Sequence, residues 1–253
     1  MINTIRADIY RLLYSKGFWI TQAIMVLVVI PSLLTQTVGR VGVNVGDDAE
    51  KVAATANWDG IHSLINFSGM SSFLIYFLIS LFVVTIGQDL SKGLLKNLFS
   101  SGVSRSHFFL SKYLVFNVIA LIQFVLYYAL TFIVGSIVNG VGSGPANFLG
   151  RFIGAFAMQL LLLQAVFAVG LVILYLTFKP VWSVLTIIIF PLVVAIVGSV
   201  MKLDWMKYLD FQGSMGSTFS LPHKELIGLL ISSCAVLIIC VGASYTYFQK
   251  KDL

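Results

Sequence analysis

Long apolar stretches separated by short polar segments dominate the pattern of this chain. Six windows contain no Asp, Glu, Lys or Arg, and each exceeds the roughly 18 apolar residues that can cross a bilayer. These windows are residues 17–39, 60–88, 113–150, 152–178, 180–201 and 226–249. The pattern predicts an all-α polytopic membrane protein with six spans. We expect the spans at about 18–38, 67–87, 113–138, 148–176, 181–201 and 226–248.

Composition supports one transmembrane domain over residues 1–253. The chain is 58% hydrophobic and 10% charged, whereas soluble domains are roughly 25% charged. Its net charge of +6 comes from basic residues that flank the spans, so we expect membrane lipid and no nucleic acid as a partner. Cys234 and Cys240 lie on one predicted helix and are too far apart along it to bridge.

Residues 1–17 are predicted to form a helix that lies in the membrane interface. Ile5, Ile9 and Leu12 share one face of this segment, and Asp8 and Arg11 lie opposite. The segment is too short and too charged to cross the bilayer, which is typical of interfacial helices.

The polar segment 88–112, between the second and third predicted spans, is the least expected feature of the chain. A membrane protein that only reverses direction needs a few residues here. We predict two short helices: Ser91 caps the first, Gly102 ends it, and Ser104 caps a second that continues into the third span. An apolar stripe then falls on one face of the first helix, formed by Leu94, Leu95, Leu98 and Phe99. Such a surface suggests contact with a partner.

The sequence offers little catalytic chemistry. It has no P-loop pattern, no paired cysteine motif and no His-Glu-x-x-His, and its three histidines are scattered. We therefore expect no catalytic, cofactor-binding or metal-binding residues, and no enzyme activity of the chain alone. Four polar residues inside the spans either bond helix to helix or line a substrate path: Asn117, Gln123, Gln159 and Gln164.

Charge in the connecting segments predicts the orientation. With the N-terminus in the cytoplasm, ten Lys and Arg residues lie inside and six outside, and three acids lie inside against seven outside. Both termini and segment 88–112 are therefore predicted to be cytoplasmic. Residues 39–66 form an outer polar loop in this topology, and residues 202–224 form an extracellular segment along the interface.

The chain resembles the membrane subunits of ATP-binding-cassette exporters of the type-2 permease class. The most similar stretch begins at Gln88-Asp89 and Ser91-Lys92-Gly93-Leu94, then continues with Gly102-Val103-Ser104-Arg105 and Lys112. Relatives often carry Thr where this chain has Leu94. The ending Phe248-Gln249-Lys250-Lys251-Asp252-Leu253 is also similar. Length and Phe-rich spans look most like the small permeases of bacterial peptide-immunity and antimicrobial-peptide exporters.

This resemblance implies a specific assembly. Two permeases, identical or paralogous, would form the pathway in a bacterial plasma membrane, and separate ATPase subunits would bind the ATP. The stripe Leu94, Leu95, Leu98 and Phe99, together with Arg105, would belong to a coupling helix seated in an ATPase groove. A short re-entrant element would precede the sixth span, within residues 202–224. The exported compounds would be amphipathic peptides or other hydrophobic molecules.

Two other functions remain open at this point. A channel or pore subunit would be expected to show rings of charge or filter carbonyls, and the sequence shows neither clearly. A membrane scaffold or sensor component that transports nothing is the third interpretation. An adjacent gene for an ATPase would favour the exporter over both.

The topology can be tested by cysteine labelling. We expect a cysteine placed at Asp47 to react with an impermeant maleimide in sealed cells, and one placed at Lys251 to react only after permeabilisation. Labelling of the Lys251 position in sealed cells would contradict the predicted orientation.

Overall fold

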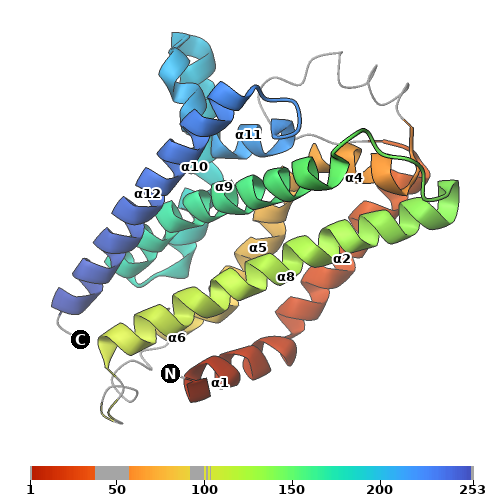
Figure 1. Cartoon of the computed structure of the whole chain (residues 1–253). Coiled ribbons are helices and arrows are strands. Elements are labelled where there is room, and N and C mark those ends of the chain that lie inside the picture. The colour runs from red at the N-terminus through yellow and green to blue at the C-terminus, as the bar shows by residue number, and fades with distance from the viewer. Residues whose placement is uncertain (1, 38–56, 92–99, 101, 103, 252–253) are drawn as a thin grey trace.

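The computed structural model describes residues 2–37, 57–91, 100, 102 and 104–251, and this part of the chain is helical. Six helical stretches are long and apolar enough to cross a membrane: Lys16–Leu34, Ser71–Leu90, Arg105–Asn139, Phe148–Thr177, Pro180–Met201 and His223–Lys250. This confirms the predicted all-α class with six spans. By helix length and hydropathy the chain is a multi-pass membrane protein. Both termini lie at the same end of the bundle (Figure 1).

The helices differ in length and regularity. The first part of the chain forms α1 (Ile2–Leu13), α2 (Lys16–Leu34), α4 (Gly60–Ser68), η1 (Ser71–Phe73), α5 (Leu74–Phe82), η2 (Val83–Gly87) and α6 (Gln88–Ser91). The second part forms α8 (Arg105–Asn139), α9 (Phe148–Thr177), α10 (Pro180–Met201), η3 (Asp204–Tyr208), α11 (Phe211–Ser217) and α12 (His223–Lys250). The second span is therefore composite, because η1, α5, η2 and α6 follow one another without a break.

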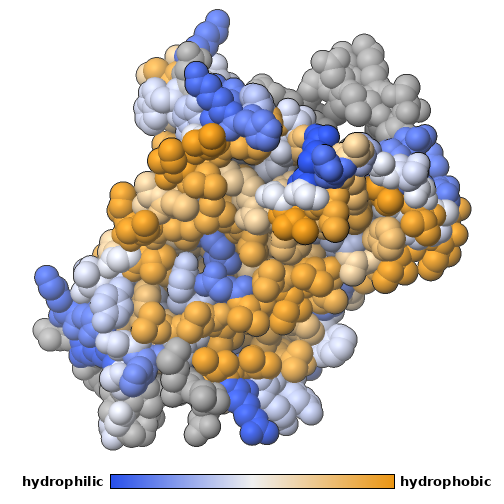
Figure 2. All heavy atoms as spheres, viewed as in Figure 1, coloured by the Kyte–Doolittle hydropathy of each residue, from blue (hydrophilic) through white to orange (hydrophobic). Residues whose placement is uncertain are grey.

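The six spans fall into an inner and an outer group. The most apolar windows of the second and fourth spans are 61% buried, whereas those of α10 and α12 are 17% and 11% buried. Hydrophobic side chains cover most of the middle of the visible face, around a small hydrophilic group, and more hydrophilic side chains gather towards its ends (Figure 2). An apolar surface of this extent is suited to acyl chains or to a partner within the membrane, not to water.

Aromatic side chains join the inner helices near the centre of the bundle. Phe82 of α5, Phe116 of α8 and Phe167 of α9 are all buried. Their ring centroids lie 5.3 Å (Phe82–Phe116), 5.4 Å (Phe82–Phe167) and 5.0 Å (Phe116–Phe167) apart. These spacings are those of favourable tilted and edge-to-face pairs, so the triad fixes three spans against one another.

The caps around segment 88–112 agree only in part with the prediction. Ser104 has extended backbone and accepts a hydrogen bond from His107 N at 3.3 Å, so it caps α8, which then runs unbroken into the third span. Gly102 has a φ of 89°, the left-handed conformation expected of it. Ser91 is the last residue of helix α6, and the helix that it was predicted to cap falls outside the described residues.

Two segments expected to be irregular are helical. Residues 60–66 were placed in an outer loop but belong to α4, which Asp59 caps by accepting from His62 N at 2.9 Å. The second span does not end at Gly87 as expected, but continues to Leu90. Both α4 and η2 lie against α8, and for α4 this packing compensates for its Gly, Ser and Asn content.

Residues 202–224 turn back towards the bundle. Helix α11 packs against α9, α4 and η1, and its Phe211 and Met215 are buried. Trp205 in the preceding η3 is 58% exposed. The segment thus combines an exposed aromatic residue with a short helix that enters the core.

A glycine contact between α4 and α8 is predicted to be essential for stability. A Cβ at Gly135 would lie 2.7 Å from Ser63 Oγ and 3.3 Å from Gly60 Cα. We expect Gly135→Ala to lower the free energy of unfolding by about 1–3 kcal/mol, the usual cost of overpacking. The measurement is the apparent unfolding temperature of the detergent-purified protein.

Gly242→Ala in α12 is the matched control. A Cβ there meets none of the described atoms within 4 Å, so this variant shares the gain in helix propensity without the clash. Equal unfolding temperatures for the two variants would contradict the close packing of α4 on α8.

Candidate functional site

The segment expected to contact a partner joins α6 to α8. Its apolar stripe, Leu94, Leu95, Leu98 and Phe99, falls outside the described residues. The structure does describe both flanks, where the segment leaves α6 and where it enters α8. These flanks lie at the end of the bundle that holds both termini (Figure 1), and each is fixed by a different set of polar contacts.

A buried ion cluster holds the first flank. Asp89 of α6 binds both Arg11 of α1 and Lys112 of α8, with Arg11 Nη2 3.1 Å from Asp89 Oδ2. Lys112 also donates to Asp8 of α1 at 2.5 Å, and Asp8 lies 3.5 Å from Arg11. Asp8, Asp89 and Lys112 are only 6%, 4% and 2% exposed. Two acids and two bases therefore form a compact, formally neutral group of four.

The π-helical turn η2 positions Asp89 in this cluster. A π-turn accommodates one residue more than an α-turn, so Asp89 faces a different direction from the one a regular helix would give it. The turn also brings the carbonyls of Val84 and Thr85 towards Arg11, whose Nη2 lies 3.3 Å and 3.4 Å from them. The guanidinium thus binds the carboxylate and the distorted backbone beside it.

The cluster corrects the expected orientation of α1. Asp8 and Arg11 were predicted to lie opposite the apolar face of an interfacial helix; Asp8 is in fact buried against the bundle and Arg11 is half-buried. Ile9 and Leu13 are exposed, as a helix with one face towards lipid requires. The helix therefore docks through a mixed face, which carries the buried Leu12 as well as Asp8.

Each charged side chain of the cluster is stabilised in its charged form by its oppositely charged neighbours. Burial opposes the charge of Arg11, but hydrogen bonding to Asp89 and the charges of Asp89 and Asp8 outweigh it and raise its pKa above the ordinary value. Asp8 Oδ2 and Arg11 Nε find no hydrogen-bond partner among the described residues. The cluster therefore has no spare hydrogen bonds. If one charged member is removed, a net charge remains buried in a medium of low dielectric constant, without a counterion.

The second flank is tied to the C-terminal end of α12. Arg105, the first residue of α8, donates through Nη1 to the carbonyls of Gln249 at 2.9 Å and Lys251 at 2.7 Å. Gln249 Nε2 in turn donates to Ser106 at 3.0 Å. The last carbonyls of a helix are its negative end, so a guanidinium there satisfies orphan acceptors and complements the helix dipole.

An aromatic cluster reinforces this second junction. Tyr175 of α9 lies between Phe109 of α8 and Phe248 of α12, with ring centroids 5.1 Å and 5.0 Å away. Lys251 then closes over Phe178 at 4.1 Å and donates to the Leu176 carbonyl at 3.0 Å. The start of α8 and the ends of α9 and α12 therefore form one packed unit.

Two of the candidate pathway residues, Gln123 and Gln159, make hydrogen bonds to other elements of the bundle. Gln159 of α9 is fully buried and joins three other elements: its Nε2 donates to Ser68 Oγ at 2.6 Å and Thr218 Oγ1 at 2.8 Å, and its Oε1 accepts from Tyr128 at 2.5 Å. Gln123 of α8 accepts from Gln22 of α2 at 2.7 Å. Both make the helix-to-helix bonds that were one of the two roles expected.

The other two candidates differ from these. Asn117 donates to the Tyr113 carbonyl of its own helix at 2.8 Å. Gln164 is 6% exposed, and neither of its amide atoms has a hydrogen-bond partner within the described part of the chain. Among the residues that the structure describes, no three His, Cys, Asp or Glu side chains are grouped as metal ligands would be.

No local pattern in the sequence marks Asp8, Arg11 and Lys112 as parts of one site. The lone acid Asp89 after an apolar span and the lone base Lys112 before the next were visible signals, because an isolated charge at a span end needs a partner. Their two partners come from a helix about 80–100 residues away, which no local pattern reveals.

Comparison with known proteins gives one match. A family model with the description "Protein of unknown function (DUF2705)" matches residues 23–253, which leaves α1 and the beginning of α2 before the matched region. No curated protein and no solved structure matches the chain.

Neutralising one member of the ion cluster is predicted to destabilise the protein. Asp8→Asn leaves an excess positive charge beside buried Lys112, and breaking a buried ion pair costs about 3–5 kcal/mol. We expect a clear fall in the unfolding temperature. Adding Lys112→Met to Asp8→Asn restores neutrality and should recover part of the loss.

Glu225→Gln serves as the control for this prediction. Glu225 pairs with Lys207 at 3.0 Å, and both side chains are partly exposed, so loss of the pair should cost less than about 1 kcal/mol. An Asp8→Asn effect as small as that of Glu225→Gln would show that the cluster is not a stabilising unit.

Proposed function

We propose that this chain, which belongs to the DUF2705 family, is the membrane-spanning subunit of an ATP-driven exporter. In this proposal two copies, or one copy and a paralogue, form the pathway in the bacterial plasma membrane. Separate ATP-binding-cassette subunits bind and hydrolyse ATP, and the chain itself contributes no catalytic residue. The exported compounds are amphipathic peptides or other hydrophobic molecules, as the resemblance implies.

One observation carries the proposal: both flanks of segment 88–112 are anchored, and to different helices. Asp89 and Lys112 connect the segment to α1, and Arg105 connects it to the end of α12. A loop that merely reverses the chain has no need of a buried four-charge cluster that joins its two flanks, nor of a guanidinium clamp at the second flank. A segment that receives a force must be rigidly joined to the helices that it moves.

Charge and topology agree with this assignment. The ten-to-six bias of Lys and Arg favours the cytoplasm for the end of the bundle that holds both termini and segment 88–112. A soluble ATPase can reach the segment only from that side. Because the sequence has no P-loop and its spans carry no charge at mid-depth, neither bound nucleotide nor a coupled ion provides an evident source of energy within the chain.

Removing the apolar stripe is predicted to release the ATPase. Leu98→Ala combined with Phe99→Ala truncates two large side chains that would anchor in the partner's groove, and such anchors contribute about 2 kcal/mol or more each. We expect the ATPase to be lost from the detergent-purified complex while the permease remains inserted and folded. The measurement is the stoichiometry of the co-purified ATPase.

Leu110→Ala with Leu114→Ala is the matched control. These two leucines are each 44% exposed on α8, outside the stripe, so their truncation also removes two large apolar side chains without touching the proposed contact. Retention of the ATPase at full stoichiometry by the stripe variant would reject the coupling role and leave the stripe as a surface resting on lipid headgroups.

A further inference from the structure

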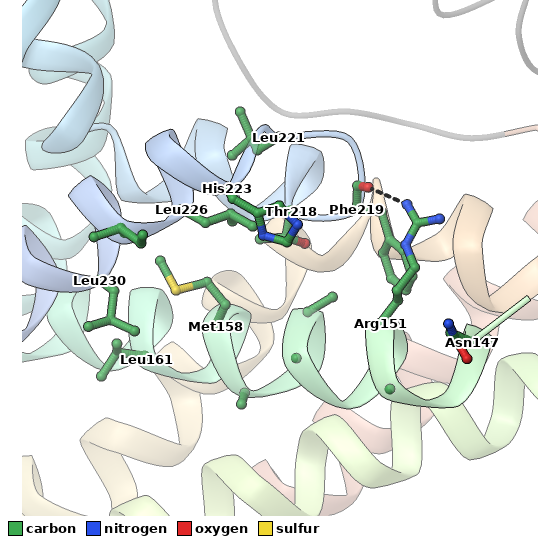
Figure 3. A pocket seen from close by; sticks show the side chains of 15 residues that line it. Asn147, Arg151, Met158, Leu161, Thr218, Phe219, Leu221, His223, Leu226 and Leu230 are labelled. Atoms are coloured by element: carbon green, nitrogen blue, oxygen red, sulfur yellow. Dashed lines mark hydrogen bonds between the residues drawn. The ribbon is translucent and has the colours of Figure 1, made fainter.

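A cavity lies at the opposite end of the bundle from the ion cluster. It has a volume of about 800 Å³ and is enclosed by the first half of α9, the segment after α11 and the first half of α12. Figure 3 shows Arg151 and Met158 rising from α9 towards the chain that carries Thr218, Phe219 and His223. Its volume is within the range of roughly 300–1,000 Å³ typical of sites for small molecules.

The walls of the cavity are apolar and partly open to the side of the bundle. Met158 and Leu161 of α9 face Leu226 and Leu230 of α12 (Figure 3). Leu230 is 49% exposed, so this wall continues onto the surface that faces the membrane. From Arg151 to Leu161 the wall extends about 15 Å along α9 at 1.5 Å per residue. An apolar trough of this length suits an extended hydrocarbon chain.

Two glycines keep the trough wide. A Cβ built at Gly150 or at Gly154 meets none of the described atoms within 4 Å, and both residues line the cavity. Two glycines four residues apart often allow a second helix to approach closely. Here no described helix packs on them, so they leave space where side chains would otherwise project.

The polar end of the cavity is basic. Arg151 donates one hydrogen bond, from Nη2 to the Phe219 carbonyl at 3.1 Å, and a guanidinium has five N–H donors. His223 lines the same end, and it is the first residue of α12, whose positive dipole end lies there. No Asp or Glu is among the described lining residues, and nearby Glu225 is engaged by Lys207.

We infer that this cavity binds an anionic phospholipid drawn from the surrounding bilayer. The phosphate lies against Arg151 and His223, and an acyl chain occupies the trough past Gly154 towards Leu161 and Leu230. Charge complementarity favours this occupant over two others. A zwitterionic lipid would bring a cation next to the basic end of the cavity. A cationic amphipathic peptide would find no carboxylate among the described lining residues to pair with. The site is therefore distinct from any pathway for a cationic peptide.

Native mass spectrometry of the detergent-purified full chain tests the inference directly. The probes are phosphatidylglycerol and phosphatidylcholine with identical acyl chains. We expect phosphatidylglycerol to bind at least about tenfold more tightly: both lipids offer a phosphate to Arg151, but only phosphatidylcholine also brings a quaternary ammonium, which the basic end of the cavity repels. Arg151→Gln should lose most of this preference, whereas Arg151→Lys should retain part of it.

A second variant fills the trough without removing charge. Gly154→Leu projects into open space, so we expect it to fold normally and to weaken both lipids. Lys202→Gln, which removes an exposed base that does not line the cavity, is the control and should leave binding unchanged. The unfolding temperature of each variant, measured without added lipid, shows whether that variant folds. If Gly154→Leu does not fold, Gly154→Ala takes its place.

Three results would overturn the inference. If the unaltered protein and Arg151→Gln each bind the two lipids with equal affinity, charge does not select the occupant of the cavity. Unaltered binding by folded Gly154→Leu would place the lipid elsewhere. A change in dimer content with Gly154→Leu and none in lipid binding would make this face an interface between two copies. The assay needs no ATPase, so its outcome is independent of the exporter proposed above.

Discussion

The buried group of Asp8, Arg11, Asp89 and Lys112 is the constraint on which the end of the bundle that holds both termini depends. Charges removed from water are stable only when each finds its counterion in good geometry. This requirement couples three elements that the chain could otherwise place independently. Helix α1 must pack on the bundle, η2 must form its π-turn, and α8 must place Lys112 within reach of both carboxylates. The segment that leaves α6 therefore starts from a fixed point.

The same principle, applied to neutral polar groups, accounts for the middle of the bundle. Lipid offers no hydrogen bonds, so the buried amide of Gln159 turns inward and collects partners from α4, α8 and the segment that ends α11. The outer surfaces of α10 and α12 carry apolar side chains instead. The resulting protein is polar at selected interior points and apolar outside, the reverse of a soluble domain.

Sequence patterns predict some of this and not the rest, for a physical reason. Charge-free windows define spans, and Ser104 and Gly102 define a helix start and a turn, because these signals act within a few residues. Helix α4, the π-turn and the inward face of α1 depend on distant partners: Gly135 admits α4, and Lys112 draws Asp8 inward. Local propensity has no information about such contacts.

Helices α9 and α12 connect the two ends of the molecule. Near the termini, Tyr175 and Phe248 pack together, and Arg105 holds the last carbonyls of α12. At the far end the same two helices enclose the basic cavity. A helix of 28 residues is about 42 Å long and stiff along its axis. A displacement of the Arg105 clamp would therefore tilt α12 as a unit and change the width of the cavity. Conversely, a molecule that fills the cavity would resist that tilt, because binding to one arrangement of two packed helices disfavours the other.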